Sequence, residues 1–181
     1  MRFLRDAVFT IGALLIVVAV IVYVAVARGG LSADERPGAI ERSIARRLVR
    51  LSIPPDAHDQ ANPYRSNANA WRESADHFDD HCATCHGADG RGHTEIGGYM
   101  YPPVPDLADP AVQQMSDGDL FYIIQYGVRW TGMPGWRKEH TPEDTWKLVS
   151  FVRRVPSLTA EDLESMAHGE EPRGGHHQHD K

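Results

Sequence analysis

The sequence feature that most constrains this chain is the pentapeptide Cys82-Ala83-Thr84-Cys85-His86. It holds the only two cysteines among the 181 residues, three positions apart, with a histidine directly after the second. That spacing is typical of covalent haem attachment, in which each thiol adds to one vinyl group of the porphyrin and the imidazole faces the iron. The motif therefore predicts one haem c, bound through two thioethers.

Three other uses of a Cys-x-x-Cys pair fit this sequence less well. A structural zinc site usually needs a second pair of ligands, and neither another cysteine nor a His-x3-His pair follows at zinc-finger distance. A thioredoxin-like redox pair follows a strand of a βαβ unit, whereas the residues before Cys82 have helical spacing. A disulfide between such close residues would close a very short loop and stabilise little.

A second constraint is an uncharged run of 21 residues from Ala7 to Ala27. As a helix it would extend about 31 Å, enough to cross the hydrocarbon core of a bilayer. Signal peptides have a shorter apolar region of roughly 7–15 residues, but Ala25-Val26-Ala27 fits a small-x-small cleavage site. We expect residues 1–30 to be a single transmembrane anchor, with a cleaved signal as the alternative.

The charges around this anchor give conflicting indications of its orientation. Arg2 and Arg5 lie on the short N-terminal side, whereas five arginines follow between residues 28 and 47. Positive charge favours the cytoplasmic side, but the first helix usually dominates orientation. We therefore expect the short N-terminus in the cytoplasm and the rest of the chain outside it.

Residues 31–69 are predicted to be a linker that contains a short basic amphipathic helix. Apolar residues recur at helical spacing with arginines between them: Ile40, Ile44, Leu48 and Leu51. Pro54-Pro55 ends this pattern. A position on anionic lipid headgroups and packing on the following domain or on a partner subunit both fit the pattern.

Residues 70–158 are predicted to form one compact all-α domain with long loops. Trp71, Ala75, Phe78 and Cys82 lie on one helical stripe, so this helix would bring the first thiol to the haem. No stretch shows convincing strand alternation. About 150 residues remain after the anchor, which allows one modest core with flanking segments.

Two further helices of this domain carry end signals in the sequence. Ser116 precedes an acidic first turn, and Gly127 ends the apolar pattern that follows. Thr141 precedes a proline at the first helical position, and that helix continues to about Val155. Residues 159–181 are acidic and His-rich with few large apolar side chains, which predicts a disordered tail.

A haem iron with one imidazole has a second axial position, which a methionine thioether suits. Met133 stands in Thr131-Gly132-Met133-Pro134-Gly135-Trp136, where glycine and proline fix an irregular loop that can present the side chain to the opposite haem face. Met100 follows His86 by only 14 residues, and the chain between them must also turn around the porphyrin edge.

Residues 70–156 carry HCATCHGADGRG, a Pro-rich segment ending in PDL, SDGDLFYIIQYGV, GMPGW and an aromatic-bearing C-terminal helix, in that order. The chain thereby resembles class I c-type cytochromes of the membrane-anchored, mono-haem kind. The resemblance implies the class I cytochrome c fold, with crossed N- and C-terminal helices around the covalent haem. It also implies thioethers at Cys82 and Cys85, and iron ligands at His86 and Met133.

The same resemblance carries further expectations about structure and location. A proline carbonyl, that of Pro105 or else of Pro103, would orient the His86 ring, as expected for a metal-bound histidine. The crossing of the terminal helices would involve Phe78 and Trp146. Haem is attached to such cytochromes on the outer side of the bacterial cytoplasmic membrane, so the domain is expected in the periplasm.

An iron with six ligands has no open position for a substrate, so we expect one-electron transfer in a respiratory-type chain rather than an enzyme. One alternative is a haem subunit of a larger membrane oxidoreductase. Another is a ligand-binding or sensor haem protein, in which Met133 is absent from the iron. Residues 70–158 contain 8 basic and 13 acidic residues, a net charge of −5, which predicts redox partners with a basic docking patch and no nucleic-acid partner.

Several other residues near the motifs have open roles. Arg129 or Trp130 would either reach a haem propionate or be an ordinary surface arginine and a core tryptophan. Three histidines flank the motif and are expected to face solvent: His77, His81 and His93. Three histidines of the tail fit either a copper or zinc site or a solvated segment: His176, His177 and His179.

Overall fold

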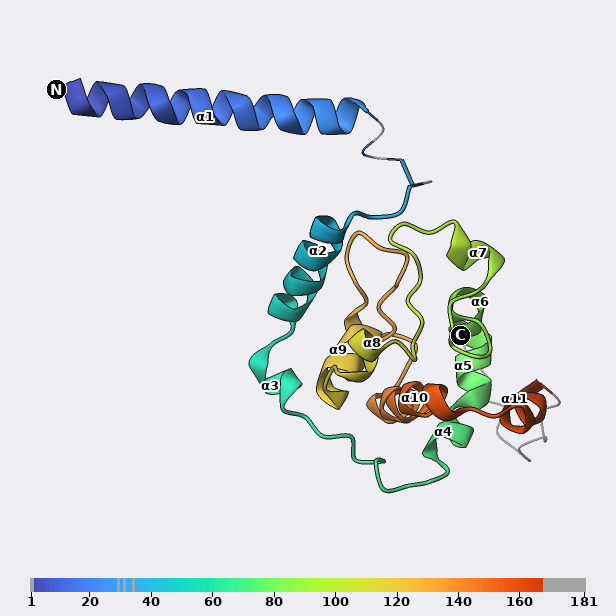
Figure 1. Ribbon diagram of the computed structural model, residues 1–181. Helices are drawn as coiled ribbons and strands as arrows, with labels where there is room; N and C mark the ends of the chain where they lie inside the picture. Colours follow the sequence, from blue (N-terminus) through green and yellow to red (C-terminus); the bar gives the residue numbers. More distant parts are fainter. Residues whose placement is uncertain (1, 29, 31, 34, 168–181) are drawn as a thin grey trace, which may run out of the picture. The chain divides into compact units, whose positions relative to one another are not determined.

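The computed structural model describes residues 2–28, 30, 32, 33 and 35–167, in which helices and loops occur without any strand (Figure 1). This confirms the predicted all-α class. The chain divides into two compact units, Met1–Glu35 and Arg36–Lys181, and each is described by itself.

The first unit consists mainly of one long helix, α1 (Arg2–Ala27), which contains the predicted anchor. Nearly all of its side chains are exposed. Among the described residues it is the one helix that is long and apolar enough to cross a membrane. A large exposed apolar surface is unfavourable in water, and a bilayer would remove it from water. A signal sequence has the same properties, so the cleaved alternative stays open.

The second unit consists mainly of short helices joined by loops. Its core contains residues from the N-terminal and C-terminal parts of this unit, among them Trp71, Leu120 and Val149. The helices are α2 (Ala39–Ser52), α3 (Pro55–His58), α4 (Ala70–Glu73), α5 (Ala75–His81), α6 (Ala83–His86), α7 (Glu95–Gly98), α8 (Pro110–Gln113), α9 (Asp117–Tyr126), α10 (Pro142–Arg154) and α11 (Ala160–Ala167), with a 3-10 turn at Val155–Ser157.

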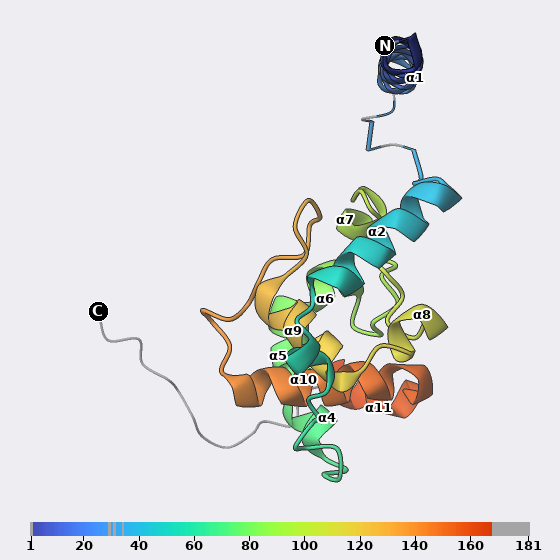
Figure 2. The ribbon, with the colours of Figure 1, turned by 90° about the vertical axis from the view of Figure 1, so that its left-hand side faces the viewer.

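Helix α10 lies across α4 and α5, and this crossing forms the centre of the core (Figures 1 and 2). The rings of Phe78 and Phe151 stack at a centroid distance of 4.1 Å. The expected crossing of the terminal helices is observed, with Phe78 at the contact, whereas Trp146 stacks on Phe121 of α9 at 4.2 Å. The predicted stripe is confirmed as a core face, since Trp71, Ala75 and Phe78 are buried.

The predicted helix before Cys82 is broken in two at Ser74. The Ser74 hydroxyl donates to the carbonyls of Trp71 and of Lys147, both at 3.0 Å. The bond to Lys147 joins the α4–α5 junction to α10. The break in the helix therefore also attaches this junction to the core. Sequence periodicity alone does not show this break, because the stripe of apolar residues continues through it.

Both helices with predicted end signals begin where the sequence indicates. Ser116 and Asp119 form a capping box at the start of α9, and Thr141 and Asp144 form another at the start of α10. Gly127 ends α9 with φ of 68°, a left-handed conformation that glycine adopts without steric cost. Gly127 and the Thr141 cap lie at the two ends of the loop that contains Met133.

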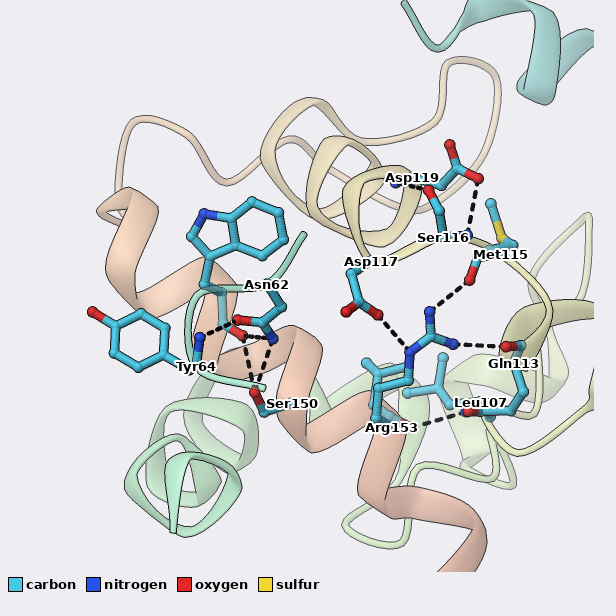
Figure 3. A network of polar contacts seen from close by, with 12 residues as sticks. Asn62, Tyr64, Leu107, Gln113, Met115, Ser116, Asp117, Asp119, Ser150 and Arg153 are labelled. Atoms are coloured by element: carbon cyan, nitrogen blue, oxygen red, sulfur yellow. Dashed lines mark hydrogen bonds and ion pairs between the residues drawn. The ribbon is translucent and has the colours of Figure 1, made fainter. Parts of the chain in front are cut away.

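Arg153 of α10 joins this helix to the segment that precedes α9 (Figure 3). Its guanidinium donates to the Asp117 carboxylate at 2.8 Å and to the carbonyls of Gln113 and Met115 at 2.7 and 2.5 Å. The Gln113 amide in turn donates to the carbonyls of Leu107 and Val152. Charge-assisted bonds of this kind are stronger than neutral ones, so α9 is held firmly on α10.

The apolar stripe of α2 has no cover among the described residues. Ile40, Ile44, Leu48 and Leu51 are all more than half exposed. The segment after α2 is nevertheless tied to the domain, because the buried Asn62 amide donates to the Trp146 carbonyl and to the Ser150 hydroxyl (Figure 3). Among the residues that the structure describes, none of the domain covers this stripe, which leaves a lipid surface or a partner subunit as its contact.

The start of the predicted disordered tail is ordered instead. Residues Ala160–Ala167 form α11, and the buried Asp162 carboxylate pairs with Arg72 and with Arg154, both at 3.0 Å. Asp162 and Thr159 also exchange bonds as a helix cap. Composition misleads here because the acidic residues that indicate disorder include one that binds two arginines from distant parts of the fold, Arg72 of α4 and Arg154 of α10. The three tail histidines lie outside the described residues.

Replacing Phe78 with alanine is expected to lower the free energy of unfolding by about 3–5 kcal/mol, because the crossing contact loses a buried ring and retains a cavity. Guanidinium unfolding of the haem-containing protein, followed by circular dichroism, measures this change. Tyr99 is 77% exposed, so Tyr99→Ala is the control and should change stability by less than about 0.5 kcal/mol. Equal losses in both variants would contradict this account of the core.

Candidate haem site

The Cys-x-x-Cys-His motif lies at the junction of α5 and α6. Cys82 is the residue between these helices, and its amide donates to the Phe78 carbonyl at 2.8 Å. The His86 amide donates in turn to the Cys82 carbonyl at 2.9 Å. Residues three apart in a helix share a face, so both thiols point from one side of this segment. Both cysteines are free and half-buried.

The environment of Cys82 disfavours the alternative uses of the motif. Burial, with a smaller effect of Cys85, raises the pKa of the Cys82 thiol to about 12. Reactive redox cysteines and zinc-bound cysteines are thiolates, which need a lowered pKa. Within the described part of the chain, neither cysteine belongs to a group of three side chains placed to hold a metal.

The backbone around His86 is clamped by the loop that follows it. The Gly92 amide donates to the His86 carbonyl at 2.6 Å. The Thr94 hydroxyl donates to the Cys85 carbonyl at 3.0 Å and accepts from the Gly97 amide at 3.0 Å. These bonds use peptide groups that the short helix α6 leaves unpaired. The loop thus fixes the direction of the His86 side chain.

The ring of His86 is set for binding a metal ion. Its Nδ1 atom is buried and has no partner that meets full hydrogen-bond geometry. Desolvation lowers the pKa of His86, and the backbone carbonyl of Pro105 partly opposes this effect. Pro105, rather than Pro103, is thus the proline whose carbonyl acts on the ring. A metal-ligating histidine usually turns its other ring nitrogen toward a carbonyl of this kind.

Gly92 allows the Pro-rich segment to approach this ring. A Cβ atom at residue 92 would lie 2.9 Å from the Val104 carbonyl oxygen and 3.2 Å from that of Pro105. Gly92 also has φ of 74°, which is unfavourable for other residues. The close approach therefore depends on glycine, and it brings the Pro105 carbonyl toward His86.

The Met133 loop is held on α9 by main-chain bonds. The Val128 amide donates to the Met133 carbonyl at 3.1 Å, and the Trp136 and Arg137 amides donate to carbonyls of Ile124 and Gln125 at 3.1 and 3.0 Å. A Cβ atom on Gly127 would lie within 2.6 Å of the Met133 oxygen and the following peptide. The half-buried Met133 thus stands on a fixed backbone, on a different element from His86.

A second thioether lies close to this loop. A Cβ atom on Gly132 would be 2.8 Å from the Met100 sulfur, so the Met100 side chain packs directly against the residue before Met133. The sequence separation between Met100 and His86 disfavours Met100 as a ligand, but the fold brings its sulfur into the same neighbourhood. Any test of the axial ligand must therefore include both methionines.

Two residues before Met133 are at the surface. Trp130 is 88% exposed and has φ of 61°, a strained conformation for a bulky residue. The prediction of a core tryptophan is therefore wrong, because the turn of Val128 and Thr131 aims this side chain outward. Arg129 is also exposed. A contact of either residue with a haem propionate stays a prediction.

The expectation that the flanking histidines face solvent is correct for His81 and His93 but wrong for His77. His77 is half-buried, and its ring contacts His140 at a centroid distance of 4.2 Å. Sequence reasoning missed His140 altogether, although the His77-x3-His81 spacing places two rings on one helical face. The segment that ends in His140 folds back onto α5 and covers this face.

Comparison with known proteins agrees with the motif and the fold. Residues 69–152 match the family described as cytochrome C oxidase, cbb3-type, subunit III. The cbb3-type cytochrome c oxidase subunit FixP of Rhizobium meliloti (strain 1021) is 34% identical over 79 residues, which are 43% of this chain and 25% of that protein. The match thus spans about a quarter of this curated relative.

In its motif, its fold and these matches, this chain is similar to c-type cytochromes over residues 69–152, and its apolar N-terminal helix is long enough to cross a membrane. Its helical domain carries a covalently bound c-type haem with iron. The residues present fit that group, because two half-buried thiols and a buried ring nitrogen without a full partner lie on one short segment.

Proposed function

We propose that this protein transfers single electrons as the haem subunit of a membrane oxidoreductase, on the periplasmic side of the bacterial cytoplasmic membrane. Cys82 and Cys85 form the thioethers, and His86 and Met133 are the axial ligands. The observation that carries this proposal is the Cys-x-x-Cys-His segment at the end of α5, with its buried ring nitrogen of His86.

The bound haem supplies reversible one-electron chemistry at its iron. The chain contributes the positions and the surroundings of the ligands. Main-chain bonds to α9 hold Met133 without help from its own side chain, so little ordering is needed when the sulfur binds. A methionine ligand raises the reduction potential and leaves no open position, which favours electron transfer over catalysis.

Replacing Met133 with leucine is expected to abolish the methionine–iron charge-transfer band of the oxidised protein and to let the reduced protein bind CO, because the sixth position opens. Haem content, measured as pyridine haemochrome, should stay unchanged. Met100→Leu is the matched control and should keep the band. Loss of the band only in Met100→Leu would make Met100 the ligand, and CO binding by the unaltered protein would favour a ligand-binding function.

Membership of a larger complex is supported by the matches and by the surface. Both the matching family and the matching relative are described as subunits of a cbb3-type oxidase. The exposed apolar stripe of α2 has no cover in the described chain, and such surfaces mark contacts with proteins or membranes. A subunit contact at this stripe explains why these residues stay apolar. The alternative is a free carrier tethered to the membrane.

The full-length protein, solubilised in mild detergent from its native membrane, is expected to migrate with a larger complex that oxidises a reduced c-type cytochrome. The double variant Ile44→Ser/Leu48→Ser should lose this association, because it makes the stripe polar. Ala45→Ser lies outside the stripe and is the matched control that should retain it. Migration of the unaltered protein alone would show a free carrier instead.

The electron partner is proposed to present a basic patch. The net charge of −5 over residues 70–158 favours such a partner electrostatically. Asp79 and Asp80 are exposed on α5, close in sequence to the haem motif, and are candidates for the docking contact. The interaction should be brief, as is usual for redox partners with small interfaces.

The bimolecular rate of electron transfer is expected to fall as ionic strength rises from about 0.01 M to about 0.15 M, because the Debye length shortens from about 30 Å to about 8 Å. Stopped-flow absorbance of the haem measures this rate. The variant Asp79→Asn/Asp80→Asn should show a weaker salt dependence, whereas Asp56→Asn, an exposed carboxylate on α3, is the control. A rate independent of salt would contradict the proposed basic partner.

A further inference from the structure

Three imidazole rings converge on one side of α5. His77 and His81 are one helical turn apart on this helix, and His140 comes from the residue before the Thr141 cap of α10. The centroid of the His140 ring lies 4.2 Å from that of His77 and 5.3 Å from that of His81. One ring nitrogen from each histidine lies within 4.8 Å of the others.

The nitrogens of this cluster lack ordinary partners. His140 is only 3% exposed, yet both of its ring nitrogens are buried without a hydrogen bond, and so is Nε2 of His77. Leaving a buried polar group unpaired costs about 1–3 kcal/mol. The nearest acidic group on α10, Asp144, does not meet this need, because its carboxylate accepts from the Thr141 amide and hydroxyl at 2.9 and 2.6 Å.

We propose that His77, His81 and His140 form a binding site for one zinc ion, separate from the haem. Two histidines spaced i, i+4 on a helix with a third from another element are a recurrent zinc ligand set. Imidazole nitrogens suit zinc, whereas magnesium and calcium prefer oxygen ligands. Three protein ligands leave the fourth position of a tetrahedral ion to water.

The geometry needs only a small adjustment to hold the ion. Zn–N bonds of about 2.0–2.1 Å place the nitrogens of a tetrahedral site about 3.4 Å apart, so ring nitrogens now within 4.8 Å must close by roughly an ångström or less per side chain. His81 is exposed, and its ring already contacts the rings of His77 and His140. Burial lowers the pKa of His140 to about 4 and also lowers that of His77, which disfavours their protonated forms.

The surroundings fix the cluster and give the ion a structural effect. The Trp136 ring stacks on His140 with an interplanar angle of 10° and a centroid distance of 4.9 Å. Asp144 and Asp80 lie close enough to act electrostatically on His77, and their negative charge favours a bound cation. A bound ion would connect α5, which leads into the haem motif, with the chain that follows the Met133 loop.

The test uses the full-length, haem-containing protein in detergent. Histidines 168, 176, 177 and 179 of the tail are replaced by asparagine in the parent, so that the tail does not take up metal. After incubation with Zn²⁺ and removal of free ion, elemental analysis is expected to find one zinc per haem. Zinc should also raise the thermal unfolding midpoint, and the haem absorption spectrum should not change.

His81→Ala is the decisive variant, because His81 is exposed and its loss should not disturb folding. It is expected to weaken zinc binding at least tenfold in calorimetry and to abolish the rise in the unfolding midpoint. His93→Ala, an exposed histidine outside the cluster, is the matched control and should bind as the parent does. Equal binding by the parent and His81→Ala, equal loss in His93→Ala, or no binding by the parent overturns the site.

Discussion

The crossing of α10 over α5 is the contact on which the haem site depends. Phe78 and Phe151 stack at this crossing, and Phe78 lies one helical turn before Cys82, so core packing sets where the first thiol stands. The same end of α10 binds the first residue of α9 through Arg153, and α9 carries the Met133 loop. Helix α10 therefore contacts both the helix that leads into the Cys82–His86 motif and the helix that carries the Met133 loop.

Signals that act over a few residues could be predicted from the sequence. The Cys-x-x-Cys-His spacing, the caps at Ser116 and Thr141 and the end of α9 at Gly127 each depend on neighbours within one or two helical turns. The break at Ser74 could not, because its hydroxyl bonds to the carbonyl of Lys147, which only the folded chain brings close. Acidic composition misplaced the start of the tail for the same reason, since the partners of Asp162 are arginines of α4 and α10.

The side chains around the proposed ligands show the same division between local and long-range information. The motif alone indicates His86 and the loop alone indicates Met133, whereas the proximity of Met100 to that loop follows from the path of the Pro-rich segment. The histidine cluster combines a visible i, i+4 spacing with a third ring from the segment before α10. Tertiary contacts thus decide which of several suitable residues share one neighbourhood.

The Met133 loop is held through peptide groups rather than through side chains, and the close fit at Gly127 leaves no room for it to shift. The exposed side chains of the same loop, Arg129 and Trp130, take no part in that attachment. Substitution of these two residues should therefore leave the backbone position of Met133 unchanged. The loop thus separates the side chains that it presents to solvent from the peptide groups that fix its path.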